Sequence, residues 1–433
     1  MFRASRAKTM AMLVQLAFSG MQTRGNIMKS ILLASASIVA FTIAGAAAAE
    51  VTFGGEVTLG FNDDDDDVED DQDGFYFSGN LAVTLTQMLD NGVTASATFD
   101  FDFVEVESGG SDGTSNNGLG LDLESGGFLL SLTSETAGLY FGDTTFAAET
   151  YWSGVGETAE DSFSEADGEI VLRGEAMFGG FTGGMSYVVG DADGNLVGDD
   201  PTLDASVDQF SAGGVFEGGN FSVGFAYQAE SEVVGAPGCI AGEVCYDPWA
   251  ANGDFTPDEI FGVFGSFTVA NAEISAAYAN NATTEENSTG IGISYPFGPV
   301  TVGATYAMNS SDAEDDIYTL TLGYANGPIT VDAEYENSAD DKDDSEDDAS
   351  FSVDAVYQVY EGFDLHAGFN GGDTNFDEDG DENLDYYFAI VYAFGEGATI
   401  TASYAVDEDD SEGDEIGGPE FQEGTTVEVS FEF

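Results

Sequence analysis

Carboxylates are by far the most numerous side chains in this sequence that could carry chemistry. The chain has 82 Asp and Glu residues against 7 Lys and Arg residues, and it has a single histidine, His366. Carboxylates at this density concentrate cations and repel anions. Nucleic acid is excluded as a partner, because neutralising its phosphates requires Lys and Arg. The chemistry to expect is therefore the attraction of mono- and divalent cations.

Two acidic segments space their carboxylates two residues apart around a glycine, as oxygen-ligand loops for calcium do. They are Asp191–Asn195 and Asp377–Asp381, and neither continues into the roughly 12-residue loop with a closing Glu. Acidic runs also arise from the composition alone, and clustered acidic loops can bind divalent cations collectively. The sequence therefore predicts no cofactor other than weakly bound calcium, through Asp191, Asp193, Asp377, Asp379 and Asp381.

Catalysis has little support in the sequence. A serine hydrolase would need His366 as a general base beside a serine and an orienting group, and nothing in the sequence marks such a serine. No enzyme activity is expected. A zinc site is not expected either, because the chain has one histidine and two cysteines, Cys239 and Cys245.

The N-terminal residues predict export. Met28–Ser30 leads into the apolar run Ile31–Ile43, and the small residues Ala46–Ala49 follow. A basic start, a short apolar middle and an A-x-A end are the layout of a secretory signal peptide, whereas a spanning helix needs roughly 20 apolar residues. We expect residues 28–49 to be a signal peptide cleaved after Ala49. Residues 1–27 have no clean apolar block and could come from a start codon placed too early, with Met28 the true start.

Cleavage would make the chain still more acidic. Five of the seven basic residues precede Glu50 and no acidic residue does, so the net charge from Glu50 onward is 2 − 82 = −80. Export also sets the redox context. Cys239 and Cys245 are therefore expected to form a local disulfide that closes one loop.

After Glu50 the dominant period of the sequence is two. In Phe75–Thr86, Val93–Phe103, Ile329–Glu336 and Leu384–Phe394, one face is mainly apolar and the other is richer in Thr, Ser, Gly, Asp and Glu. Strict alternation predicts half-buried strands. No run of about 18 apolar residues follows Glu50, so no spanning helix is expected. The predicted lumen-lining carboxylates on the polar face are Asp100, Asp102, Asp332, Glu334, Asp354, Asp385, Glu428 and Glu432.

Short turns and long acidic loops alternate between these strands. The turns contain Gly and Asn, as in Asp90–Gly92 and Asn326–Pro328, because tight hairpins need residues that tolerate a positive φ. This layout predicts an all-β fold, a transmembrane antiparallel up-and-down β-barrel of about 16 to 20 strands with short periplasmic turns and long extracellular loops. The loops are expected at residues 63–73, 107–118, 191–204, 230–258, 281–287, 309–316, 338–348, 371–383 and 407–424.

The main alternative is a soluble β-sandwich or a string of adhesin modules. The apolar face of a sandwich is its core, which seldom carries many tyrosines at strand ends, whereas a membrane barrel has aromatic girdles at the lipid–water interfaces. A long meander in lipid must also close, because an unpaired edge is not stable there. The barrel is favoured, and its loop-side girdle is expected at Tyr278, Tyr306, Tyr324, Tyr335, Tyr357 and Tyr404.

Three short segments resemble the Gram-negative general (non-specific) outer-membrane porin family. Thr426–Phe433 alternates and ends on an aromatic residue, and Glu50–Val57 is similar to the first porin strand. Gly138–Asp143 is similar to the porin strand that leads into the long third loop, which in this family folds into the barrel and narrows the pore. The resemblance implies a homotrimer in outer-membrane lipid, with Phe433 recognised by the barrel-assembly machinery.

The resemblance also implies a constriction loop at about residues 144–167. The residues expected at the constriction are Glu149, Glu157, Glu160, Asp161, Glu165 and Arg173. Porins of this type set a cluster of arginines across the pore from the acidic third loop, and here only Arg173 could take that part. The sequence departs in a second way, since about 20 candidate strands exceed the roughly 16 to 18 of porins. Either two hairpins are extra or some segments are extracellular β-structure.

The expected function is a water-filled, cation-favouring channel for passive diffusion of ions and small hydrophilic solutes. Carboxylates lining a narrow passage focus negative potential and concentrate cations. The alternative is a non-conducting outer-membrane adhesin or structural barrel, in which bulky apolar side chains would point inward. The acidity of the loops could also serve to keep the protein hydrated in a salty habitat.

Overall fold

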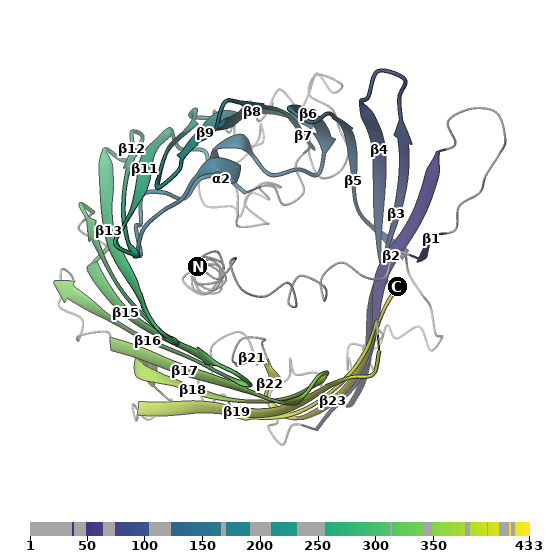
Figure 1. The fold of residues 1–433 in the computed structure, drawn as a ribbon, viewed down its shortest axis with the longest axis vertical. Coiled ribbons are helices and arrows are strands. Elements are labelled where there is room, and N and C mark those ends of the chain that lie inside the picture. The colour runs from purple at the N-terminus through teal and green to yellow at the C-terminus, as the bar shows by residue number, and fades with distance from the viewer. Residues whose placement is uncertain are drawn as a thin grey trace, which may run out of the picture.

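Twenty antiparallel strands form a closed barrel in the computed structural model of this chain (Figure 1). The structure describes residues 37–38, 49–63, 74–103, 123–165, 170–190, 209–231, 256–311, 314–340, 349–376, 382–395, 397–406, 415–416 and 421–433. The predicted fold class is confirmed, at the upper end of the predicted strand number.

The first ten barrel strands are β2 (Glu50–Asp63), β3 (Gly74–Met88), β4 (Thr94–Phe103), β5 (Leu123–Thr133), β6 (Ala137–Gly142), β7 (Ile170–Phe178), β8 (Phe181–Gly190), β9 (Phe210–Gly218), β10 (Phe221–Gln228) and β11 (Ile260–Val269). The other ten are β12 (Ala272–Asn281), β13 (Glu286–Phe297), β14 (Val300–Asn309), β15 (Asp316–Asn326), β16 (Ile329–Asp340), β17 (Ala349–Tyr360), β18 (Phe363–Phe376), β19 (Glu382–Ala393), β20 (Ala398–Val406) and β23 (Gly424–Glu432).

The barrel closes where its first and last strands meet. Each strand pairs with the next along the chain, and β23 pairs with both β20 and β2. This seam runs from Glu56 opposite Glu432 to Asp63 opposite Thr425. Closure leaves no open sheet edge along the seam, which is the condition for strands in lipid.

Four short elements are additional to the twenty barrel strands. Strand β1 (Ser37–Ile38) pairs with β2 at Phe53 and Thr52. Strands β21 (Glu415–Ile416) and β22 (Phe421–Gln422) form a separate two-stranded sheet, and helix α2 spans Ala147–Tyr151. Within the described ranges, no helix has the length and apolar character needed to cross a membrane.

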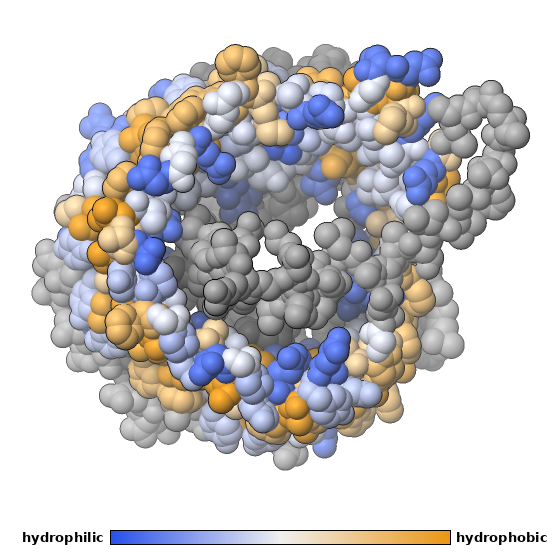
Figure 2. Space-filling model, viewed as in Figure 1, coloured by the Kyte–Doolittle hydropathy of each residue, from blue (hydrophilic) through white to orange (hydrophobic). Residues whose placement is uncertain are grey.

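The alternation of the sequence turns one face of each strand outward and the other inward. Outward apolar side chains are exposed, such as Leu59 at 51% and Phe388 at 48%, whereas the neighbouring inward residue Ala389 is fully buried. Figure 2 shows apolar residues along the outer rim of the barrel and hydrophilic residues around its inside. A continuous apolar outer surface of this kind is suited to contact with lipid.

Two of the predicted long loops are short turns. Strand β12 ends at Asn281 and β13 begins at Glu286, and the Asn281 side-chain oxygen accepts hydrogen bonds from the N–H groups of Thr283 and Thr284. Glu285 completes this turn with a φ of 62°. The predicted loop at 309–316 is also mostly a short connection between β14 and β15. The acidic composition of this connection resembles that of the long loops, so it does not predict a tight turn held by side-chain hydrogen bonds.

The tyrosines mark both ends of the barrel rather than one. Tyr324 lies two residues before the end of β15 at Asn326, and Tyr357 lies near the end of β17 at Tyr360, so both stand beside short turns. Their predicted place at the loop side was wrong. At the same end the rings of Tyr360 and Phe363 stack with centroids 5.2 Å apart. Girdles at both interfaces are what a membrane barrel requires.

Several predicted features fall outside the described residues. They are residues 1–27, most of the predicted signal peptide, the loop centres, the two cysteines Cys239 and Cys245, and the predicted calcium ligands Asp191, Asp193, Asp377, Asp379 and Asp381.

Candidate functional site

The chain between β6 and β7 folds into the barrel instead of outward. Residues 144–165, here called the inner segment, include α2 and run along the inside of the wall formed by β8 to β14 (Figure 1). This is the stretch predicted at 144–167, of which the last two residues lie outside the described part. The inner segment therefore occupies the lumen, where it can limit what passes.

Glycines on the inward face of the wall make room for the inner segment. A Cβ added at Gly213 would come within 2.9 Å of the Tyr151 Cβ, and one at Gly262 would collide with the Trp152 indole. A Cβ at Gly290 would collide with the Val155 carbonyl group. Only glycine allows the two backbones to approach this closely. The inward glycines thus define a seat for the segment.

Side chains of the wall also hold the backbone of the inner segment. The wall residues accept hydrogen bonds from four N–H groups: Ala147 to Ser186 Oγ at 2.9 Å, Ala148 to Ser211 Oγ at 3.0 Å, Ala159 to Asn309 Oδ1 at 3.0 Å and Glu160 to Ser288 Oγ at 2.8 Å. Two of these bonds satisfy N–H groups in the first turn of α2, which have no partner within the helix. The segment is therefore fixed to the wall along its length.

Contacts between Trp152, Phe163 and Asp161 hold distant parts of the inner segment together. The Trp152 ring packs against Phe163 and Phe264, with centroids 5.3 and 5.5 Å away. Its Nε1–H donates to Asp161 Oδ2 at 2.8 Å, and the Thr158 hydroxyl donates to the same oxygen at 2.6 Å. Burial nevertheless raises the pKa of Asp161 to about 6, because desolvation outweighs the two donors.

Glu160 is the most enclosed carboxylate of the inner segment. Only 7% of its surface is exposed. Its pKa is raised to about 7, first by burial and then by Glu286 of β13, through charge repulsion and a hydrogen bond between the two side chains. The other predicted acidic residues of the segment, Glu149, Glu157 and Glu165, are partly exposed. The segment thus presents some carboxylates to the lumen and buries others against the wall.

Arg173 lies beneath the inner segment and not across the lumen from it. From β7 its Nη1 donates to Thr150 Oγ1 at 3.2 Å, and it pairs with Glu175 at 3.6 Å. The guanidinium carbon also lies 4.7 Å from the centre of the Tyr140 ring. The side chain of Arg173 is 12% exposed. Its charge is therefore largely balanced on the same side of the lumen, and it supports the segment.

The wall formed by β16 and β17 carries carboxylates at inward positions. Asp332 lies directly opposite Asp354 in the register, and Glu334 is the next inward residue on β16. The Tyr387 hydroxyl donates to Asp354 Oδ1 at 2.6 Å. All three side chains are partly exposed. This wall therefore places three carboxyl groups toward the lumen.

The remaining predicted lumen carboxylates differ in their burial and in their hydrogen bonds. Asp100 and Asp102 share the inward face of β4, and Glu428 on β23 accepts a 2.5 Å hydrogen bond from the Tyr76 hydroxyl. Asp385 is 1% exposed and accepts from the Asn370 amide at 3.1 Å, so it is buried and does not line the lumen. The alternation of the sequence assigns Asp385 to the inward face of β19, but it does not show whether the side chain is buried there.

The seat of the inner segment was not anticipated from the sequence. Its signal was present, because Gly184, Gly213, Gly262 and Gly290 all fall on the inward face of strands that each also carry a serine on that face. Glycine within a strand often marks a close backbone approach. Read across neighbouring strands, these glycines would have located the covered wall.

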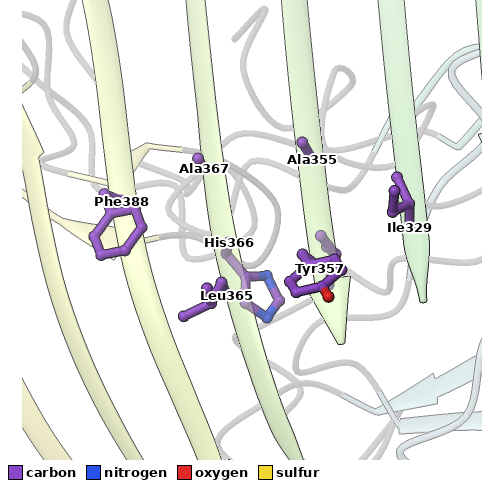
Figure 3. Close-up of a pocket in the computed structure, with 8 residues that line it drawn as sticks. Ile329, Ala355, Tyr357, Leu365, His366, Ala367 and Phe388 are labelled. Carbon is purple, nitrogen blue, oxygen red and sulfur yellow. The ribbon is translucent and has the colours of Figure 1, made fainter. Parts of the chain in front are cut away.

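A concavity on the outer face belongs to the lipid side. Figure 3 shows the small residues Ala355 and Ala367 near the larger Tyr357, Leu365 and Phe388. These five residues have outward parity in the register of β17 to β19. Together with Ile329, Val356 and His366 they line a depression of about 240 Å³. The depression is therefore separate from the lumen.

Comparison with known proteins places the chain among outer-membrane proteins. Residues 34–243 and 236–377 match the sequence profile of the Gram-negative porins. A mutant porin of Rhodopseudomonas blastica with five substitutions is 16% identical, with 88% of this chain and 100% of that chain covered and a TM-score of 0.42. A triple mutant of that porin is also 16% identical, with the same coverage and a TM-score of 0.41. No curated protein matches the chain.

Proposed function

Because the chain belongs to the Gram-negative porin family, we propose that it forms a water-filled, cation-favouring channel for passive diffusion of ions and small hydrophilic solutes. Membership of this family points to an outer-membrane channel rather than an enzyme. The cation preference is the finer part of the proposal, and it has its own support in the charges of the lumen.

The observation that carries the cation preference is the row of inward carboxylates on β16 and β17. Asp332, Glu334 and Asp354 face the lumen, whereas the charge of Arg173 is taken up by Glu175. From Glu50 onward the sequence has one other basic residue, Lys342, against 82 acidic residues. Low-dielectric walls focus the field of such carboxylates, so cations accumulate in the lumen and anions are repelled.

The proposal includes export and assembly. Strand β2 begins at Glu50, directly after the predicted cleavage point at Ala49, which agrees with a signal peptide at 28–49. By resemblance to porins, the mature chain is a homotrimer in outer-membrane lipid and is recognised by the barrel-assembly machinery through Phe433. That residue is 55% exposed at the end of β23.

The test is the reversal potential of the purified protein in a planar bilayer under a KCl gradient. We expect a potential near the K⁺ Nernst value that falls toward zero at molar salt, because the Debye length shortens from about 10 Å at 0.1 M to about 3 Å at 1 M. An absence of conductance would contradict the proposed channel function and favour the non-conducting adhesin or structural barrel. Conductance with anion preference would mean that the carboxylates do not control the passage.

A further inference from the structure

A second segment of the chain folds into the barrel, beside the last strands. Figure 1 shows β21 and β22 inside the ring of strands, next to β19, β20 and β23. The described residues of this second insert are Glu415–Ile416 and Phe421–Glu423. The two pieces pair as antiparallel strands, with Glu415 opposite Gln422 and Ile416 opposite Phe421.

Phe421 anchors the second insert to the inward face of the wall. Its side chain is 5% exposed and packs in a cluster with Tyr387, Ala389 and Ala405. The ring centroids of Phe421 and Tyr387 are 5.0 Å apart, and the His366 ring is 6.1 Å from Phe421. The insert is therefore packed against the wall.

The chain leaving the second insert is tethered to the first strand. The Asn62 side-chain amide donates to the Glu423 carbonyl at 3.0 Å, and the Thr426 hydroxyl donates to Asn62 Oδ1 at 3.2 Å. Asn62 and Thr426 are each 3% exposed. The tether therefore holds the C-terminal end of the insert at the seam, next to the Phe421 anchor.

The seat of the second insert has the same chemical character as the seat of the inner segment. Ala389 and Ala405 are 0% and 1% exposed and pack with Phe421, whereas Gly368 on β18 leaves room for the Tyr387 ring. Small inward residues again mark the place where a segment lies on the wall. A lumen position that faced only water would not need to be small or apolar.

From these contacts we propose that the second insert is a fixed narrowing element that sets the size limit of the channel from the wall opposite the inner segment. The inner segment lies on β8 to β14, whereas the second insert lies on β19, β20 and β23, so solutes pass between the two. The open walls that remain include β16 and β17 with their carboxylates. This inference rests on the proposed channel function and names what determines its solute range.

The position of the second insert can be tested without measuring conductance. Ala389 lies beneath the insert and Ser352 lies at an inward position of the open wall, opposite Glu334. In the mature protein reconstituted into vesicles, we expect Ala389→Cys to resist a cationic methanethiosulfonate reagent and Ser352→Cys to react readily. Labelling of the wild-type chain, which has Cys239 and Cys245, provides the background. Equal labelling rates at the two positions would overturn the proposal.

The size limit is tested by Phe421→Ala, with Phe431→Ala as the matched control. Phe431 is an outward residue of β23 and is 42% exposed. We expect Phe421→Ala to raise single-channel conductance, to shift the cut-off for sugars in vesicle swelling to larger molecules, and to expose Ala389→Cys to the reagent. Unchanged conductance and cut-off with Ala389→Cys newly exposed would overturn the narrowing role. An absence of conductance in the wild-type protein would instead contradict the channel itself.

Discussion

The wall of β8 to β14 and the wall of β16 and β17 belong to one barrel and follow one alternation, yet their inward side chains differ. Where the inner segment lies, the wall presents glycine and hydroxyl or amide side chains, such as Gly213, Ser211 and Asn309. The wall of β16 and β17 presents Asp332, Glu334 and Asp354. In a chain with 82 acidic residues this separation needs a physical cause.

The cause is the difference between a covered and a wet surface. A carboxylate pressed under another segment loses its water and costs several kcal/mol unless a cation or several donors replace it. Hydroxyl groups can instead donate to or accept from the backbone that covers them. The wet wall carries no such penalty. Glu160 shows the exception, because its enclosed carboxyl group responds with a raised pKa instead of a partner cation.

The largest effect is expected from adding bulk to the covered wall. Gly290→Val would place carbon atoms where the Val155 carbonyl group lies, so the inner segment must leave its seat. Overpacking of this kind costs roughly 1 to 3 kcal/mol. We predict altered single-channel conductance and a lower unfolding temperature. The control is Ser352→Val on the open wall, where the unfolding temperature should stay near wild type. Equal destabilisation by both changes would remove the distinction between the walls.

A smaller effect is expected from removing charge on the open wall. Asp332→Asn combined with Asp354→Asn removes two neighbouring lumen carboxylates while keeping their size. The K⁺/Cl⁻ permeability ratio should fall by roughly a factor of 3, because the focused negative potential is weaker. The measurement is the reversal potential at low salt. Glu175→Gln is the contrasting variant, since it frees the charge of Arg173 on the covered side. If the double variant kept the wild-type ratio, the open wall would not be the selectivity element.

The smallest effect concerns pH and the docking of the inner segment. The pKa values of Glu160 and Asp161, about 7 and about 6, lie above the ordinary 4.5 and 3.8. Because both carboxyl groups have raised pKa values in the docked segment, they stabilise docking fully when the pH is below their ordinary pKa values. This stabilisation is lost as the pH rises through the raised values of about 6 to 7. Around Glu160, both Glu286 and Glu314 add repulsion.

Hydrogen exchange of the Glu160 amide, which donates to Ser288 Oγ, reports this docking. After correction for the intrinsic rate, its protection should decline between about pH 4 and about pH 7 and change little above that. In Glu160→Gln the decline should be much weaker, whereas Glu149→Gln should behave like the wild type. A protection factor independent of pH in the wild type would contradict the assigned ionisation of Glu160.

The strands and their faces could be predicted from the sequence because a period of two is a local property. The inner segment could be placed at 144–167 by resemblance to porins. The buried state of Asp385 and Glu160 could not be predicted, because it depends on distant segments that cover them. The connection at 281–287 could be located from the sequence, but its tight form could not be predicted, because the capping role of Asn281 depends on geometry.

The seam between β2 and β23 has a consequence for how the protein is made. The hydroxyl oxygens of Thr58 and Ser430 lie 3.1 Å apart although 372 residues separate them in the sequence. Pairings of such long range form slowly, and an unpaired strand edge is prone to aggregation. The edge of β2 that pairs with β23 stays unpaired until the last strand has been synthesised and has reached the barrel. The kinetic weak point of this protein is therefore the interval between synthesis of its first strand and its last, and not any part of the finished barrel.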